Sequence, residues 1–529
     1  MSNFNPKPAK TKVNFERESV DLKPDWFNMM KWAYLIAVPA LLLFSCTASK
    51  QSFNPDKKFS PAQLQEDYTL FRNILEESHP SLYWYTPKDS MDYFFTTGYD
   101  KIRDSMTESE FKTLLSYVIS RIDCGHTAVK SSKKYSKYLD TAKLKTFPLS
   151  LKFWGDTMVV TANLNRRDSI LKRGVILTSI NGYTQKQLRD SLFNYIVTDG
   201  YSTCGKYQSL STGFAFANLY KNVYGSTDSF RIGYIDSNGM ETNLKLPTYD
   251  FMNDTMSRWG FSLHRPDEKK KKTEPRFVFF ASTNLQLDTG LRTAYMALNT
   301  FDKGNHLKKF FRQSFKAIKQ NRIENLVIDV RSNGGGEAGN STRLTRYLID
   351  HKFKLADSLY SVNRSSRYDK YIEKSFIYHV LMDFATKKED DGKYHFGYYE
   401  RKYFKPKKKN HFNGKVYVLI GGNSFSATTL FAGALKGQKN ITLVGEETGG
   451  GYYGNTAWVI PDVTLPNTRV RFRLPKFRLI VDRNREKNGR GVMPDVWSTP
   501  SVEAISKGID FKSEKARELI ETQVVKKAN

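Results

Sequence analysis

Two serines, Ser424 and Ser426, stand where a buried strand turns abruptly into a helix. The run VYVLI, from Val416 to Ile420, is typical of a strand covered on both faces, and GGNS then interrupts it. From Ser426 the apolar residues follow helical spacing, and Gly437 fits the end of that helix. Free backbone N–H groups at a helix start can stabilise an oxyanion beside a serine, but the same position suits an ordinary helix cap. The corner alone fits both roles.

A glycine-rich turn, RSNGGG at residues 331–336, follows the strand NLVIDV and precedes a helix. Its spacing differs from the dinucleotide-binding fingerprint, and the later acidic residue of that fingerprint is missing. Three consecutive glycines let backbone N–H groups approach a ligand closely. The turn is therefore a candidate ligand-binding loop of another kind.

A histidine, His126, lies where a well-defined helix ends. The capping box TESE at Thr107–Glu110 opens this helix, and its apolar residues keep helical spacing up to Ile122 before the chain continues as DCGHTAV. An earlier capping box, SPAQ at Ser60–Gln63, opens another helix with proline at its first position. A helical segment is therefore expected to supply the histidine.

Length and composition predict a globular protein of about three domains. The cysteines Cys46, Cys124 and Cys204 are too few for a disulfide framework and lack metal-site spacing. The formal net charge is +29, but the basic residues are spread along the chain and no nucleic-acid-binding motif accompanies them. The dense runs Lys269–Lys272 and Lys405–Lys409 favour a solvated surface or attraction to anionic lipid over nucleic-acid binding.

The N-terminal region predicts export. Its apolar run, from Trp32 to Phe44, is short for a membrane-spanning helix. With LFSC at its end it resembles a bacterial lipoprotein signal peptide, which implies lipidation of Cys46; cleavage at another site is the alternative. The polar stretch before it suggests that translation starts at Met29 or Met30. We therefore expect a membrane-anchored lipoprotein of a bacterial cell envelope, on the periplasmic side or in the outer membrane.

The middle and C-terminal regions differ in pattern. From Phe147 to about Tyr249, short strands with one helix follow the order of a PDZ-like module, and an unrelated β-rich insert is the alternative. From Arg276 strands and helices alternate, which favours a mostly parallel sheet. The expected parts are an extension with signal peptide (1–46), a tether (47–56), a helical domain (57–145), the PDZ-like module (146–250), a Lys-rich linker (251–275), a catalytic core (276–505) and a C-terminal helix or tail (506–529).

Four motifs together suggest a family. IDVRSNGGG, LIGGNSFSATTLFAGALK, LVGEETGGG and GRGVMPDV occur in the order found in the tail-specific and tricorn-type serine peptidases, which include the C-terminal processing proteases and the repeats of interphotoreceptor retinoid-binding protein. EESHPSLYWY and DCGHTAV also resemble the N-terminal helical segment of this family, so the resemblance covers about residues 57–500. It implies a multidomain α+β fold with a ClpP/crotonase-like core.

The resemblance implies roles for individual residues. Ser426 falls on the nucleophile of the family, with Ser424 as the rival. The oxyanion hole would use the N–H of Gly334 or Gly335 and that of Ala427.

The general base separates two branches of the family. Processing proteases commonly use a lysine after the VGE strand, but the matching stretch here is TGGGYYG, and Lys436 and Lys439 are expected to be solvated. The tricorn-type branch instead takes its base from the histidine of DCGHT, which implies His126. His79 is the runner-up, with a packing role as its alternative reading.

The acidic partner of the histidine stays open. The family position of the glutamate holds Asn488 here, so Glu486, two residues earlier, is the preferred candidate, and Asp123 is the other. The family requires no cofactor, and no metal-ligand cluster is visible in the sequence.

The function predicted from these features is that of a serine-type endopeptidase of the cell envelope acting on peptides or protein C-terminal regions. Its expected partners are a peptide or unfolded substrate and the membrane, without nucleic acid. The alternatives are a catalytically inactive peptide-binding protein of the same fold and an esterase or amidase using the same serine. The sequence does not indicate the oligomeric state.

Overall fold

The computed structural model describes residues 53–142, 144–252 and 283–528, with side chains up to residue 522. The chain divides into two compact units, Met1–Asn54 and Pro55–Asn529. The expected signal peptide, Cys46, most of the tether and almost all of the Lys-rich linker lie outside the described residues. Within the described residues, no helix has both the length and the apolar character that crossing a membrane requires. The following description concerns the second unit only.

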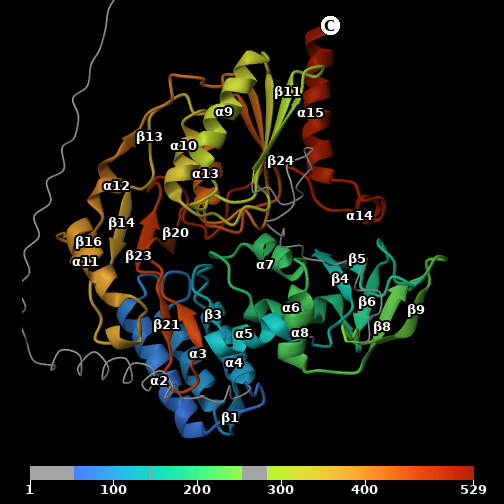
Figure 1. The fold of residues 1–529 in the computed structure, drawn as a ribbon, viewed down its shortest axis with the longest axis vertical. Coiled ribbons are helices and arrows are strands. Elements are labelled where there is room, and N and C mark those ends of the chain that lie inside the picture. Colours follow the sequence, from blue (N-terminus) through green and yellow to red (C-terminus); the bar gives the residue numbers. More distant parts are fainter. Residues whose placement is uncertain (1–52, 143, 253–282, 529) are drawn as a thin grey trace, which may run out of the picture. The chain divides into compact units, whose positions relative to one another are not determined.

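A six-stranded sheet, ordered β10-β11-β12-β18-β19-β24, forms the centre of the C-terminal region (Figure 1). Its first pair is antiparallel and all its other neighbours are parallel. Helices α9, α10 and α13 pack on one face, and α15 packs on the other, which explains the near-continuous apolar strands. The bounds are β10 (Thr283–Asp288), β11 (Thr293–Leu298), β12 (Asn325–Asp329), β18 (Lys415–Ile420), β19 (Ile441–Gly445), β24 (Val496–Trp497), α9 (Leu307–Gln320), α10 (Ala338–Thr345), α13 (Ala427–Leu435) and α15 (Phe511–Ala528).

The N-terminal helices form a second core. Both predicted capping boxes are confirmed, at Ser60 with Gln63 and at Thr107 with Glu110. The apolar face of α4 is buried in this core, and the chain leaves the helix through Asp123, whose φ is 50°. The bounds are β1 (Lys58–Phe59), α2 (Pro61–Ser78), α3 (Lys88–Asp100), β2 (Met106–Thr107), α4 (Glu108–Ser120), β3 (Val129–Lys130) and α5 (Lys133–Thr141).

The middle segment folds around its own apolar cluster. It contains three α-helices among its described residues, whereas the sequence analysis predicted one. The two additional helices were missed because their sequences resemble loops, although Phe216, Ala217 and Tyr220 have helical spacing and are buried. The bounds are β4 (Leu149–Trp154), β5 (Thr157–Asn163), β6 (Leu177–Ile180), β7 (Tyr183–Thr184), α6 (Gln185–Leu192), η1 (Phe193–Tyr195), α7 (Thr203–Leu210), α8 (Ala215–Tyr224), β8 (Ser229–Ile235) and β9 (Glu241–Pro247).

A second sheet, ordered β15-β16-β14-β23-β20, is built from two separate parts of the C-terminal region. Nearby, β22 pairs with β3, so this region contacts the segment that follows His126. The bounds are β13 (Phe353–Lys354), β14 (Ser358–Ser361), η3 (Asp369–Tyr371), α11 (Ser375–Ala385), β15 (Lys387–Lys388), β16 (Tyr394–His395), α12 (Gly397–Arg401), β17 (Tyr403–Phe404), β20 (Gly454–Ala457), β21 (Asp462–Thr464), β22 (Arg471–Arg473), β23 (Phe477–Ile480) and α14 (Val502–Lys507).

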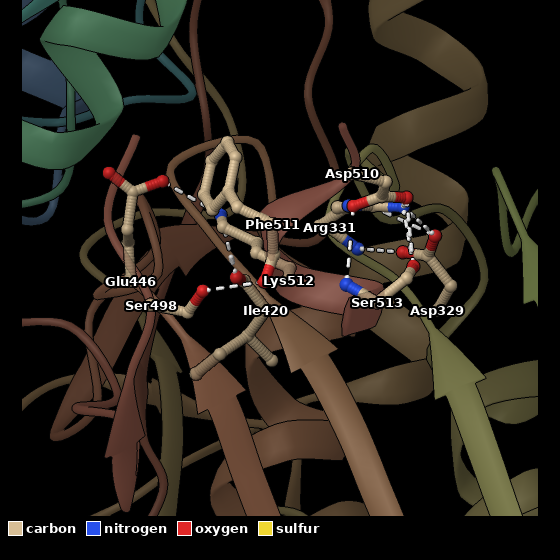
Figure 2. Close-up of polar contacts among 9 residues, drawn as sticks. All are labelled: Asp329, Arg331, Ile420, Glu446, Ser498, Asp510, Phe511, Lys512 and Ser513. Carbon is tan, nitrogen blue, oxygen red and sulfur yellow. Dashed lines mark hydrogen bonds and ion pairs between the residues drawn. The ribbon is translucent and has the colours of Figure 1, made fainter. Parts of the chain in front are cut away.

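Ionic contacts fasten the start of α15 to the loops at the carboxyl ends of the central strands (Figure 2). Arg331, the first residue of the RSNGGG turn, pairs with Asp329 and with both carboxylate oxygens of Asp510. Buried Lys512 donates to the Ile420 carbonyl at 3.1 Å and lies 2.7 Å from a Glu446 carboxylate oxygen. The C-terminal helix therefore holds the loops that follow β12, β18 and β19.

Candidate active site

Ser426 occupies a sharp turn between β18 and α13. Its φ of 56° and ψ of −122° lie where residues other than glycine are rare, which marks a strained elbow. The loops around it approach so closely that a Cβ on Gly335 would lie 2.7 Å from the Ser426 Cβ, and one on Gly450 would lie 3.1 Å from the Ser426 nitrogen. The hydroxyl makes no capping bond to the helix. The predicted strand and helix are confirmed, and the corner is not a simple cap.

His126 contacts Ser426 directly. The His126 Nε2 and Ser426 Oγ atoms are 3.0 Å apart, although 300 residues separate them in the sequence. The imidazole is buried against the Phe425 ring, at a centroid distance of 4.6 Å. Burial, with a smaller contribution from the positive charge of Arg473, lowers the pKa of His126 to about 3. The ring is therefore neutral at neutral pH and can accept the serine proton.

The other ring nitrogen, His126 Nδ1, is buried without a hydrogen-bond partner among the described residues. Glu486, the preferred acid, is exposed and accepts a hydrogen bond from Asn488 Nδ2 at 3.0 Å instead. Asp123 is half-buried, and burial raises its pKa to about 6. Within the described part of the chain, no hydrogen bond joins any of these three side chains to His126. The geometry therefore does not support Glu486 as the acidic partner, because its loop carries the carboxylate into solvent.

The glycine turn after β12 lies against the elbow. The Gly335 N–H donates to the Asn333 side-chain oxygen at 2.9 Å, so this N–H is already engaged. The N–H groups of Gly334 and Ala427 donate to no other described residue. A Cβ on Gly335 would lie 3.1 Å from the Ala427 nitrogen, which brings the turn next to that donor. Of the candidate oxyanion donors, Gly334 and Ala427 are available.

Asn333 organises this turn, a role that sequence reasoning missed. The side chain is fully buried, donates to the Leu298 carbonyl at 3.1 Å and accepts from the Thr428 hydroxyl at 2.8 Å as well as from Gly335. It thus links the glycine turn to the first turn of α13. The signal was present, since asparagine commonly bonds the backbone two residues further on.

Ser424 and His79, the alternatives to Ser426 and His126, form hydrogen bonds elsewhere. Ser424 is fully buried, donates to the Val330 carbonyl at 2.9 Å and accepts from the Gly421 N–H at 3.2 Å. His79 is buried with both ring nitrogens engaged, one 2.8 Å from the Thr127 hydroxyl and the other accepting from the Ser81 N–H at 3.2 Å. Both side chains therefore support the local backbone.

The loop after β19 leaves no room for a lysine. A Cβ would lie 2.2 Å from the Gly422 carbonyl oxygen at Gly449, 2.3 Å from Thr429 Oγ1 at Gly450, and 2.5 Å from the Gly454 carbonyl oxygen at Gly451. Real Cβ atoms essentially never approach so closely, so no side chain fits at these three positions.

The two lysines near α13 lie elsewhere. Lys436 is paired with Asp495 at 2.5 Å, and Lys439 is exposed.

A further buried acid, Asp199 of the middle segment, was not foreseen. Its two carboxylate oxygens accept from the Gly125 N–H at 2.9 Å and from the Gly451 N–H at 3.3 Å. Burial raises its pKa to about 6. Asp199 thus ties the His126 loop to the loop beside Ser426, and no local pattern in VTDGY indicates this.

Among the described residues, one group of side chains could together bind a metal ion. It consists of Glu389, His395 and Glu400. His395 Nδ1 is 2.8 Å from a Glu400 oxygen, and Nε2 is 3.2 Å from Asp391. These contacts already occupy both ring nitrogens, and Ser426 and His126 are not part of the group.

Part of the sequence and the fold of the chain are similar to those of known proteins. The sequence model of Peptidase family S41 matches residues 292–498. Mature CPAF aligns with a TM-score of 0.57 at 13% identity, covering 87% of this chain and 96% of that chain. Mature CPAF complexed with lactacystin gives 0.59 at 13% identity, covering 88% and 98%. At such identities the likeness shows the fold.

Other comparisons add less. A photosystem II D1 C-terminal processing protease covers 85% of this chain and 98% of its own at 15% identity, with a TM-score of 0.39. No curated protein gives a significant match. The match of residues 292–498 to the model of Peptidase family S41 indicates a serine peptidase, and the solved structures agree with it in fold.

Proposed function

We propose that the protein is a serine endopeptidase of the cell envelope that cleaves peptides or protein C-terminal regions through an acyl-enzyme on Ser426. The observation that carries this proposal is the 3.0 Å contact between Ser426 Oγ and His126 Nε2 at a strained strand-to-helix elbow. Nucleophile and base within hydrogen-bond reach are the minimum that such chemistry needs.

The proton transfer follows from this contact. The Ser426 hydroxyl donates to Nε2, so the neutral ring carries its own proton on Nδ1. As Ser426 Oγ attacks the substrate carbonyl carbon, Nε2 takes the hydroxyl proton and later gives it to the departing amine. Water then attacks the acyl-enzyme with the same histidine as base, which releases the acid product and restores the serine.

The oxyanion formed in each step needs hydrogen-bond donors. We assign the Gly334 and Ala427 N–H groups to this role, since both are unengaged within the described residues and flank Ser426. Each such donor contributes about 2.7–4 kcal/mol to transition-state stabilisation. The bound Asn333 side chain keeps the glycine turn in place without using these two donors.

The base is proposed to act without a carboxylate partner. Its pKa of about 3 disfavours the imidazolium of the free protein, so the negative oxyanion must help to stabilise the charge as it develops. The Asp199 carboxylate accepts a hydrogen bond from the Gly125 N–H and thereby positions the loop that carries His126.

The setting of the enzyme is part of the proposal. The middle segment would act as a PDZ-like module that recognises substrate or gates the site, and its Asp199 contact with both catalytic loops supports this.

Lipidation at Cys46 would anchor the enzyme in the envelope. Cys46→Ala should release the protein from the membrane fraction, and persistence there would argue against this anchor.

The test is labelling with a serine-directed fluorophosphonate followed by digestion of a peptide library. Ser426→Ala and His126→Ala should each abolish labelling and cleavage with an unchanged circular dichroism spectrum. Ser424→Ala is the matched control for the nucleophile, and loss of labelling there alone would refute the assignment.

The same assays separate the alternatives. Glu486 is exposed, and His126 Nδ1 has no partner within the described residues, which favours an inactive peptide-binding protein as the second candidate. Absence of labelling in the wild type would indicate that candidate. Labelling without peptide cleavage would instead indicate an esterase or amidase.

A further inference from the structure

Arg473, the last residue of β22, carries a positive charge beside the proposed base. Its backbone N–H donates to the Ala128 carbonyl at 3.0 Å, so the strand holds it against the loop that carries His126. Phe472 and Leu474, its neighbours in the chain, are fully buried in the core of the N-terminal helices. Since side chains alternate along a strand, Arg473 faces the opposite side. His126 lies on that side, within reach of the Arg473 charge.

The guanidinium of Arg473 has no partner among the described residues. The side chain is half-buried, and its Nε is buried without a hydrogen bond. Within the described part of the chain, no carboxylate lies at ion-pair distance from it. A buried donor without a partner costs free energy, and a guanidinium is the group that best matches a carboxylate. The fold therefore leaves a carboxylate-binding group unused beside the proposed active site.

The acid that stands opposite this arginine is engaged by other cations. Asp462 and Arg473 face each other in the pairing of β21 with β22. The Asp462 carboxylate instead accepts from Lys130 at 2.8 and 2.9 Å and from Arg471 at 3.2 Å. It is therefore compensated without Arg473.

The acids near the histidine loop also have cations of their own. Asp199 accepts from two backbone N–H groups and lies within reach of the Arg478 charge. The charges that act on Asp123 are those of Lys206 and Arg121. The uncompensated charge beside the base is therefore positive.

A cation at this position opposes the proposed proton transfer. His126 must become an imidazolium as it takes the proton of Ser426, and a neighbouring positive charge raises the free energy of that state. A carboxylate bound to Arg473 would cancel this charge. The described residues supply no such carboxylate, and the molecule that enters the site during the reaction is the substrate.

We propose that Arg473 binds a carboxylate of the substrate and thereby selects acidic substrates. The proposal rests on the proposed peptidase function, since it names the substrate class of that same site. Guanidinium and carboxylate form two parallel hydrogen bonds, which fix orientation as well as charge. An acidic side chain near the scissile bond and the carboxyl terminus of the substrate offer the same group. Either would hold the substrate and also favour the charged form of the base.

Binding to the Ser426→Ala variant tests this contact without chemistry. Two fluorescent peptide libraries, identical except that glutamine replaces every acidic residue in one, are compared by anisotropy, each with a free and with an amidated C-terminus. Libraries that carry a carboxylate should bind about tenfold more tightly than the amidated glutamine library, and adding Arg473→Met should reduce this ratio to about twofold or less. Arg473→Lys should give an intermediate ratio, because it keeps the charge without the planar fork.

The same comparison identifies the source of the carboxylate. A preference for the acidic residues assigns it to a side chain, and a preference for the free end assigns it to the substrate terminus. Either preference supports the proposal if it depends on Arg473.

Kinetics measure the effect on the base. For a peptide that the wild type cleaves, removal of the recognised carboxylate should lower kcat as well as raise KM, and Arg473→Met should abolish this difference. The acid limb of fluorophosphonate labelling, for which the probe brings no carboxylate, should move to higher pH in Arg473→Met. The reason is that this variant lacks the positive charge that lowers the pKa of His126.

Lys415→Met is the matched control. Lys415 is an exposed cation at the first residue of β18, whereas Ser426 follows the other end of that strand. Its removal changes the net charge equally and should leave both the carboxylate preference and the acid limb unchanged. Thermal melting should be unchanged in Arg473→Met, because its side chain has no partner among the described residues to lose.

The outcomes separate this proposal from the proposed function. Equal binding of all the libraries, a preference that survives Arg473→Met, or one that Lys415→Met removes as well would overturn the role of Arg473. Labelling and cleavage without any carboxylate preference would leave the peptidase and refute its acidic specificity. An Arg473-dependent preference in binding, with no labelling or cleavage by the wild type, would refute the peptidase and leave the carboxylate site.

Discussion

The buried His126 should make the stability of the protein sensitive to acid. His126 is 5% exposed, and burial with the nearby Arg473 charge lowers its pKa to about 3 from an ordinary value of 6.5. In the unfolded chain the ring regains its ordinary pKa and binds a proton more readily. The stability that this group contributes is therefore fully present above pH 6.5 and is lost as the pH falls toward 3.

The size of the effect follows from the two pKa values. Each pKa unit corresponds to about 1.4 kcal/mol, so protonation of the unfolded chain alone removes about 2 kcal/mol between pH 7 and pH 5. His79, whose pKa is also lowered to about 3 by burial, adds a loss in the same direction. The wild type should consequently lose more stability than either single variant.

Urea unfolding at pH 7 and pH 5 measures this difference. His126→Gln should reduce the acid-induced loss of unfolding free energy by about 2 kcal/mol, because the variant has no proton to bind at this site. His351→Gln, at an exposed position, is the control and should behave like the wild type. An acid-induced loss in His126→Gln equal to that of the wild type would refute the buried, neutral histidine.

The pH dependence of activity is a second measure of the pKa of His126. Since the proposed base is neutral well below pH 6.5, the acid limb of kcat/KM against pH should lie far below that value. A limb near 6.5 would show that the base is a solvated histidine.

Three further perturbations test other parts of the site. Lys436→Met should leave peptide turnover unchanged, because this lysine is paired with a carboxylate away from Ser426; a hundredfold loss measured by steady-state kinetics would restore a lysine mechanism. Gly450→Ala should lower kcat about hundredfold, since its Cβ would lie 2.3 Å from Thr429 Oγ1 and 3.1 Å from the Ser426 nitrogen and must displace the loop beside Ser426; wild-type kcat would contradict this loop geometry. Lys512→Met should lower the unfolding free energy by about 3–5 kcal/mol in urea titrations by leaving Glu446 unpaired, whereas the control Lys515→Met, at a half-exposed ion pair, should cost about 1 kcal/mol or less; equal losses would contradict the buried pair.

Local patterns predicted the elements that carry Ser426. The apolar run of β18, the helical spacing after Ser426 and the end of α13 before Gly437 are all confirmed, because each depends on neighbours in the sequence. Both capping boxes are confirmed for the same reason. The family resemblance then singled out His126, which the sequence alone places only at a helix exit.

Long-range features could not be predicted from such patterns. The approach of His126 to Ser426 depends on the pairing of β22 with β3, more than 300 residues apart in the chain. Asp199 acts through backbone N–H groups of two distant loops, so no spacing indicates it. The sequence indicates Glu486 only through its distance from a turn, and sequence distance does not determine on which side of a loop a carboxylate lies.

Three costs of folding converge on the proposed active site. Ser426 holds a backbone conformation that glycine would adopt with less strain, and Asp199 is a carboxylate buried with two N–H partners. His126 buries a ring nitrogen that has no partner among the described residues. Glycine, asparagine and an apolar residue would each relieve one of these costs, so stability alone does not account for the residues present. All three lie where the helical segment, the middle segment and the central sheet meet. The sequence therefore retains local instability at the position where a nucleophile, a base and their support must be held together, which is the pattern expected of a site selected for chemistry.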